Sequence, residues 1–393
     1  MSKDGKILDS ESQQLERWTE HFKETLNAEH QADVPVIEQF GIELDIDIGE
    51  VSRDEIRKAI LRLKNGKSPG LDAITAEMLK ADIETSTTMF HELFRHIWTH
   101  DTIPNDWAKG LIIKLLKKGD QSDCNNWRGI TLLSVPSKIL LRVLLNRIDD
   151  AIDEILRKEQ AGFRSGRGCI DHIFTLRNII EQSIEWQNKL VLNFIDFRRA
   201  FDSIKRSCLW AILRAYGVPF KIITLIQAFY NNYECCVLHN GQQSEWFQVT
   251  SGVRQGCIIS PILFITAIDW CMRTTLGNEI TGIRWTMNSF LEDLDFADDI
   301  CLLSSNRNNL QNKTTRPNET AQRIGLTINE KKTKLMNISS NTIQPVHLGH
   351  NIIEEVEDFT YLGSMLSNTN GTAKDIRARI SKARYAFCQL QPI

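Results

Sequence analysis

The chain has 393 residues, of which 42% are hydrophobic and 25% charged, and its formal net charge is −3. This ordinary composition predicts a soluble globular protein of two or three subdomains. The small net charge excludes a globally basic nucleic-acid-binding protein, so such binding requires a local patch. The nine cysteines form no Cys-x-x-Cys pair, the N-terminus is polar, and the longest apolar run, 257–268, is too short to span a bilayer. We therefore expect an intracellular protein that is not secreted.

The first part of the chain is predicted to contain helices followed by a β-hairpin. Apolar residues at helical spacing predict helices near residues 15–26, 52–63 and 90–98, and a further helix is expected through Met78. Ser52 precedes the second of them, and Glu55 completes a capping box. Two predicted strands, 107–116 and 127–133, bracket a basic turn at 117–120 and form a flap that could contact phosphates. A solvated basic face would give the same charge pattern.

Two amphipathic helices then precede a buried strand. Pro136 opens the first helix and the second runs through residues 173–184, with a flexible basic loop at 162–168 between them. Residues 190–196 are mostly apolar, which predicts a buried strand that ends in the carboxylate of Asp196.

The remaining elements alternate between helices and hairpins. Residues 234–249 form a predicted hairpin, and its Asn240-Gly241 pair is typical of a type I′ turn. The later predicted elements are an apolar helix from Ser260, a helix near 306–324 interrupted by Pro317, a strand near 329–336, a hairpin element at 358–364 and a final amphipathic helix carrying Ile376.

An acidic segment, 288–304, is predicted to form a strand, a tight turn and a second strand, with Asp298 and Asp299 at the turn. Glutamate or aspartate occupies five of the nine positions from Leu291 to Asp299. Like charges packed among apolar residues cost free energy unless cations neutralise them. Because Mg²⁺ prefers oxygen ligands and takes one or two carboxylates from a protein, this tip is a candidate cation site. Taken alone, such a pair is more often a solvated turn.

Asp196 and Asp298 would converge if their two strands were neighbours in one sheet. Two carboxylates at a sheet edge suit a two-metal site for in-line displacement at phosphorus. The basic residues Lys117, Lys118 and Arg128 could hold a triphosphate. Lys332 or Lys334 could protonate departing pyrophosphate. Together these residues indicate nucleotidyl transfer.

The sequence resembles the reverse transcriptases of non-long-terminal-repeat (non-LTR, LINE-type) retrotransposons, most closely those of RTE-like elements. Residues 194–202, 252–264, 296–299 and 325–334 resemble the family's four successive polymerase motifs, 361–364 its primer grip, and 67–74 and 117–133 its fingers motifs. The likeness covers nearly the whole chain in the family's order. Each motif is weak alone, but five or more in sequence are highly specific.

The resemblance implies an α+β right-hand polymerase fold with helical fingers, an antiparallel-sheet palm and a truncated thumb. The implied domains are an N-terminal extension at 1–50, fingers at 51–187, a palm with interleaved fingers helices at 188–366 and the start of the thumb at 367–393. The resemblance also implies that the upstream endonuclease domain is absent from this chain. Gly129 stands where the family usually has proline.

The implied activity is RNA-directed DNA polymerisation, in which a primer 3′-hydroxyl attacks a dNTP. The implied cofactor is a pair of Mg²⁺ ions, which Mn²⁺ could replace. The implied partners are an RNA template, a DNA primer and dNTPs, without a membrane, and the implied location is the nucleus or the cytoplasm.

Residue roles follow from the matched motifs. The resemblance assigns catalysis to Asp196, Asp298, Asp299 and Lys332, and metal binding to Asp196 and Asp298 with the backbone at Ile195 and Phe197. It assigns dNTP binding to Lys118, Arg128, Phe201, Gln255 and Gly256. Phe201 would be a steric gate that rejects a 2′-hydroxyl. It assigns the primer grip to Tyr361, Leu362 and Gly363.

Two rival functions share these residues. A catalytically silent relic would keep the fold but lack the activity, and a metal-dependent nuclease would use the same acids. The nuclease would not need Phe201 or the basic flap. Asp202 is as well explained by a structural role at a helix start as by a catalytic one.

Overall fold

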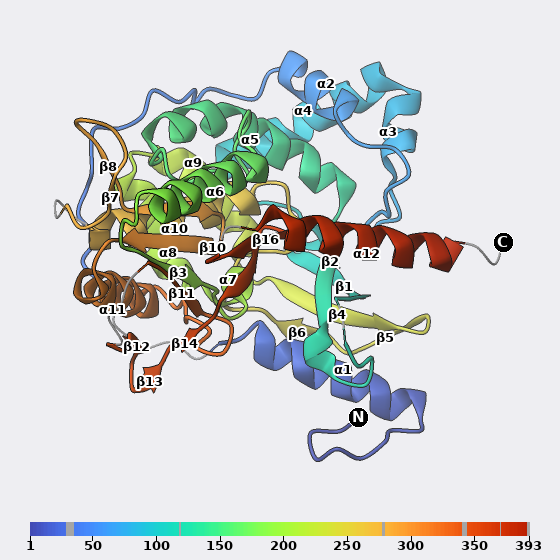
Figure 1. Ribbon diagram of the computed structural model, residues 1–393. Coiled ribbons are helices and arrows are strands. Elements are labelled where there is room, and N and C mark those ends of the chain that lie inside the picture. Colours follow the sequence, from blue (N-terminus) through green and yellow to red (C-terminus); the bar gives the residue numbers. More distant parts are fainter. Residues whose placement is uncertain (29–34, 118, 277–279, 340–343, 370, 391–393) are drawn as a thin grey trace. The chain divides into compact units, whose positions relative to one another are not determined.

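The computed structural model describes residues 1–28, 35–117, 119–276, 280–339, 344–369 and 371–390 (Figure 1). Helices and sheets are both abundant, which confirms the predicted α+β class. The chain divides into two compact units, each made of two separate stretches of sequence. The first unit contains residues 1–155 and 199–267, and the second contains residues 156–198 and 268–393. Within the described ranges, the helices are all too short or too polar to cross a membrane.

The first unit contains a five-stranded sheet. Its strands are β1 (Lys109–Leu116), β2 (Trp127–Leu132), β4 (Glu234–His239), β5 (Gln242–Gln243) and β6 (Phe247–Gln248). The order is β2-β1-β4-β5, β6 also pairs with β4, and only the β1–β4 pair is parallel. The predicted flap is therefore confirmed as the β1–β2 hairpin. Asn240 and Gly241 both have positive φ angles, as the predicted type I′ turn requires.

Helices make up the rest of this unit. They are α1 (Glu11–Thr25), α2 (Arg53–Leu61), α3 (Ala76–Ala81), α4 (Ile83–His100), α5 (Val135–Ile155), α7 (Ala200–Ser203), α8 (Arg206–Ala215), α9 (Phe220–Tyr230) and the first part of α10 (Ser260–Leu276), with short 3-10 turns at Asn105–Ala108 and Cys124–Asn126. The predicted capping box is present, because the Ser52 hydroxyl accepts from the Glu55 amide while the Glu55 carboxylate accepts from the Ser52 amide. The apolar stripe of α5, which includes Leu140 and Leu144, is fully buried core.

The second unit is built on another five-stranded sheet. Its strands are β3 (Leu190–Ile195), β9 (Asp293–Phe296), β10 (Asp299–Ser304), β11 (Lys334–Ile338) and β14 (Glu354–Glu355). They follow the order β14-β11-β3-β10-β9 and are antiparallel except for the β11–β14 pair. Every residue of β3 is buried, as expected for a central strand.

Helices pack on this sheet through alternating side chains of β3. Leu192 and Phe194 share a buried cluster with Leu176 of α6 (Cys169–Glu185). Asn193 instead donates a 2.8 Å hydrogen bond to Thr314 of α11 (Arg307–Arg323). Successive side chains of a strand point to opposite faces of its sheet, so α6 and α11 contact β3 from opposite faces.

The predicted interruption at Pro317 is wrong. Helix α11 runs through this residue, although proline lacks an N–H group and normally costs about 3 kcal/mol within a helix. Pro317 is buried, and the Cys271 thiol donates to its carbonyl oxygen at 3.7 Å. Tertiary packing therefore outweighs the local preference against proline.

Smaller hairpins and a last helix complete the second unit. They are β7–β8 (Ile283–Arg284 and Phe290–Leu291), β12–β13 (His347–Leu348 and Asn351–Ile352), β15–β16 (Asp358–Tyr361 and Ser364–Ser367) and α12 (Thr372–Leu390). Asp375 fixes the start of α12, because its carboxylate accepts from the Met365 amide and from Arg177, both at 2.8 Å.

The nine cysteines are all free thiols. Seven are buried, Cys169 is half-buried, and Cys388 on α12 is exposed. Burial raises the pKa of Cys235 to about 12, and burial likewise raises the pKa of Cys271 to about 12.

Candidate active site

The acidic pair lies on a tight hairpin between β9 and β10. Phe296 pairs with Asp299, so the turn consists of Ala297 and Asp298 alone. Ala297 has a φ of 57°, a left-handed conformation that a non-glycine residue adopts at a steric cost. The predicted strand, turn and strand are therefore confirmed, with Asp298 in the turn and Asp299 at the start of β10.

Strand β10 lies directly beside β3, which brings the distant aspartates together. Ile300 pairs with Ile195, and continuing this antiparallel register by one residue puts Asp299 opposite Asp196. Such pairs have Cα atoms about 4.5–5.5 Å apart. Burial raises the pKa of Asp299 to about 6, and repulsion from the Asp298 and Asp196 carboxylates acts in the same direction.

A lysine completes this carboxylate cluster. The amide of Asn329 donates to the Asp196 carbonyl at 2.7 Å, which ties the loop before β11 to the end of β3. Lys332 in this loop puts its Nζ 3.1 Å from Oδ2 of Asp196. Lys334 instead bonds to Glu354 at 2.5 Å. Of the two lysines that the sequence left open, only Lys332 is paired with Asp196.

The oxygen-rich cluster fits a magnesium ion in its donor chemistry. Oδ2 of Asp196 is buried and accepts no hydrogen bond, although Lys332 lies near it as an ion-pair partner. Across the described ranges, no group of three or more His, Cys, Asp or Glu is arranged to hold a metal by itself. Mg²⁺ usually takes one or two carboxylates from a protein and completes its shell with water and phosphate oxygens. Ile195 lies in the β3–β10 ladder, and Phe197 forms a β-bridge with Ile328.

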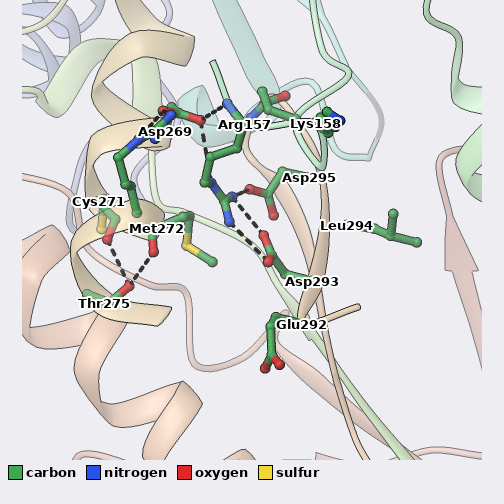
Figure 2. A network of polar contacts seen from close by, with 12 residues as sticks. Arg157, Lys158, Asp269, Cys271, Met272, Thr275, Glu292, Asp293, Leu294 and Asp295 are labelled. Carbon is green, nitrogen blue, oxygen red and sulfur yellow. Dashed lines mark hydrogen bonds and ion pairs between the residues drawn. The ribbon is translucent and has the colours of Figure 1, made fainter. Parts of the chain in front are cut away.

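A buried arginine pairs with two further acids of the hairpin, Asp293 and Asp295 (Figure 2). Arg157 makes two hydrogen bonds to Asp293, of 3.1 and 2.7 Å, and also bonds to Asp295. Its backbone amide donates to Asp269 at 2.8 Å, and its guanidinium lies 3.4 Å from the same carboxylate. Arg273 pairs with Asp269 as well. The sequence predicted that cations must offset this charge, but it assigned no role to Arg157.

Gln160 holds the turn itself. Its side-chain oxygen accepts from the amides of Ala297 and Gly162, each at 2.8 Å, and its side-chain nitrogen donates to the Ala297 carbonyl at 3.4 Å. Gln160 is fully buried. Arg164, which was expected in a flexible basic loop, is also buried and donates to the carbonyls of Arg157 and Gln160.

The primer-grip candidates form a hairpin turn in the same unit. Leu362 and Gly363 both have positive φ angles and connect β15 to β16. The Tyr361 side chain is buried, and its hydroxyl lies 3.3 Å from the Leu294 carbonyl and 3.4 Å from that of Asp299. Tyr361 therefore supports the acidic hairpin from within.

The nucleotide-binding candidates belong to the first unit. Phe201 is half-buried and stacks on Phe264, with ring centroids 4.2 Å apart. Arg128 is exposed on β2. Lys118 lies outside the described residues. Arg199 donates to Asn125 at 2.9 Å, and sequence reasoning did not single out this basic residue.

Gln255 and Gly256 pack against β2 and α7. The side-chain amide of Gln255 donates to both carboxylate oxygens of Asp202, at 2.8 and 2.9 Å. The backbone carbonyl of Gln255 accepts from the backbone amide of Thr131. Burial raises the pKa of Asp202 to about 6. A Cβ on Gly256 would lie 2.5 Å from the Thr131 backbone oxygen, so the close approach of the backbone at Gly256 to Thr131 requires glycine. Asp202 thus has a structural role in holding Gln255.

Adjacent carboxylates and a lysine at the ends of neighbouring antiparallel strands are an arrangement that suits metal-assisted phosphoryl or nucleotidyl transfer. Residues 115–366 match the family model described as reverse transcriptase (RNA-dependent DNA polymerase). This match covers more than half of the chain, so the chain belongs to the reverse transcriptase family.

Its similar relatives are proteins of non-LTR retrotransposons. The transposon TX1 uncharacterized 149 kDa protein of Xenopus laevis is 27% identical, over 65% of this chain and 19% of that protein. The retrovirus-related Pol polyprotein from type-1 retrotransposable element R2 of Popillia japonica is 24% identical, over 84% and 47%. The probable RNA-directed DNA polymerase from transposon X-element of Drosophila melanogaster is 25% identical, over 86% and 38%. The chain thus spans less than half the length of each relative. The assignment to RTE-like elements stays a prediction.

Proposed function

We propose that this chain copies RNA into DNA by joining dNTPs to a primer 3′-hydroxyl, as the polymerase region of a non-LTR retrotransposon protein. The observation that carries the proposal is the β3–β10 register, which brings Asp196 beside Asp299 and the Asp298 turn. Family membership supplies the reaction class. The second unit would then contain the palm and α12 the start of the thumb, while the first would contain most of the fingers. The predicted domain boundaries remain part of this proposal.

The proposed cofactor is a pair of divalent cations, with Mg²⁺ expected and Mn²⁺ as a substitute. Asp196 and Asp298 would hold them, because carboxylate oxygens suit hard cations, and the backbone at Ile195 and Phe197 would assist. When bound, such ions activate the attacking hydroxyl and stabilise the charge on the leaving oxygen.

Lys332 is the proposed general acid. Its exposed ammonium group lies beside Asp196, so it can donate a proton to the departing pyrophosphate oxygen. Lys334 is less suited to this role, because its ammonium is held by Glu354 and by the Lys331 carbonyl.

The first unit would bind the incoming dNTP. Arg128 would contact the triphosphate by charge-assisted hydrogen bonds. Phe201 is held against Phe264, so its ring can act as a rigid gate beneath the sugar. Asp202 fixes the amide of Gln255, which would support the template base. The RNA template would be recognised through its backbone and 2′-hydroxyl groups, with a DNA primer paired to it.

Primer extension tests the proposal directly. The chain alone, and the chain fused to the thumb region of a relative, are incubated with a primed RNA template, dNTPs and Mg²⁺. We expect template-dependent extension and a loss of at least about 10³-fold in Asp298→Asn, with an unchanged unfolding temperature. Shortened nucleic acid would indicate a nuclease. Binding without reaction in both folded forms would defeat the polymerase assignment.

A further inference from the structure

The segment that leads into α6 runs along β9 as an additional edge. Gln160 forms a parallel bridge with Asp295. The amide of Asp295 donates to the Glu159 carbonyl at 3.0 Å, and the amide of Ala161 donates to the Asp295 carbonyl at 2.8 Å. This backbone ladder brings the Gln160 side chain to the point where β9 ends and the turn begins.

At the turn, the Gln160 side chain makes the hydrogen bonds that the backbone of its segment makes along β9. Its amide group meets both the N–H and the C=O of Ala297, as a neighbouring strand would. A second bond from Gly162 to the same oxygen fixes the orientation of the side-chain amide. Because Gln160 is fully buried, water does not compete for these bonds.

The turn needs this support because its conformation is strained. Ala297 has a positive φ, and no glycine or asparagine is present in the turn to relieve the steric cost. A Cβ on Gly162 would lie 2.1 Å from the Ala297 nitrogen, so the approach of the two segments depends on glycine. Strained residues of this kind persist only where their surroundings hold them.

We propose that Gln160 is a positioning residue that fixes the Ala297–Asp298 turn and so sets the Asp298 carboxylate beside Asp196 for metal binding. The inference deepens the proposed function and rests on it for the identity of the metal site. Glutamine suits the position because it offers both an acceptor and a donor. Glutamate would lose the bond to the Ala297 carbonyl and add a negative charge to an acidic hairpin.

The test removes the hydrogen bonds while keeping the volume. Gln160→Met is close in size but cannot bond to Ala297, and Thr314→Val is a matched control that removes a buried hydrogen bond to Asn193. Mn²⁺ binding is measured by the loss of the free-ion electron paramagnetic resonance signal. We expect roughly tenfold weaker Mn²⁺ binding in Gln160→Met, and little change in Thr314→Val.

A rescue variant separates positioning from general stability. Glycine adopts positive φ without steric cost, so Ala297→Gly added to Gln160→Met should restore several-fold of the lost Mn²⁺ affinity. Unchanged Mn²⁺ affinity in Gln160→Met, or an equal loss in Thr314→Val, would overturn the inference. Mn²⁺ binding that depends on Gln160 in a protein without primer extension would refute the polymerase assignment and leave the positioning role standing.

Discussion

Replacing Arg157 by methionine should destabilise the second unit severely and in a pH-dependent way. The guanidinium is nearly buried and contacts Asp293, Asp295 and Asp269, which are each at most 1% exposed. Removing one partner of a buried ion pair typically costs about 3–5 kcal/mol, because the remaining charge stays uncompensated. Arg157→Met leaves several such charges, so we expect a loss at the upper end of that range near neutral pH.

The pH dependence follows from the aspartates. Burial and the Asp293 carboxylate already raise the pKa of Asp295 well above its ordinary value, and loss of Arg157 would raise it further. A carboxyl whose pKa is raised on folding stabilises the protein below its unfolded pKa of about 4, and this contribution is lost as pH rises through the folded pKa. The deficit of Arg157→Met should therefore grow as pH increases.

Urea unfolding at about pH 5 and about pH 8 measures this difference. Hydrogen exchange of the β9 and β10 amides shows whether the loss is in the second unit. Arg95→Met is the control, since its ion pair with Glu92 is more than half exposed and should contribute at most about 1 kcal/mol. A loss no larger than that of the control would refute the charge-compensation argument.

Three further changes probe the site. Phe201→Ala should admit ribonucleotides and raise their use relative to dNTPs by roughly 10- to 100-fold in primer extension, and unchanged discrimination would remove the gate assignment. Lys332→Met should slow single-turnover extension by roughly 10²-fold, while Lys334→Met should change it little. Equal effects of the two substitutions would argue against Lys332 as the general acid. Gly162→Ala should lower both stability, by about 1–3 kcal/mol, and extension, because its Cβ would clash with Ala297 at 2.1 Å; a wild-type melting temperature would contradict that contact.

Local signals in the sequence were sufficient for some of the hairpins, whereas β7–β8 and β12–β13 were not predicted. Apolar residues on both sides of an acidic pair at a turn predicted the β9–β10 hairpin, and Asn240-Gly241 predicted another, since these features depend on neighbours in the chain. Asp196 was selected because a buried strand ends at it. That β3 and β10 are adjacent was an assumption of the sequence argument, and the register now confirms it.

The supporting residues of the site could not be found in the same way. Arg157 and Gln160 contact residues more than 130 positions later, and no local pattern records such a pairing. The sequence contained one signal for Arg157, because acidic residues packed in an apolar hairpin require a cation to offset their charge. Pro317 was misjudged for a related reason, since local preference pointed to a break and long-range packing prevented it.

The distribution of thiols makes α12 easy to observe. Alkylating reagents attack thiolates, and the seven buried cysteines are shielded from such reagents. A maleimide fluorophore should therefore attach first to Cys388, and Cys169→Ser would remove the next most accessible sulfur. The natural chain thus carries its own attachment point on α12, from which fluorescence anisotropy could follow this helix as primed RNA is added.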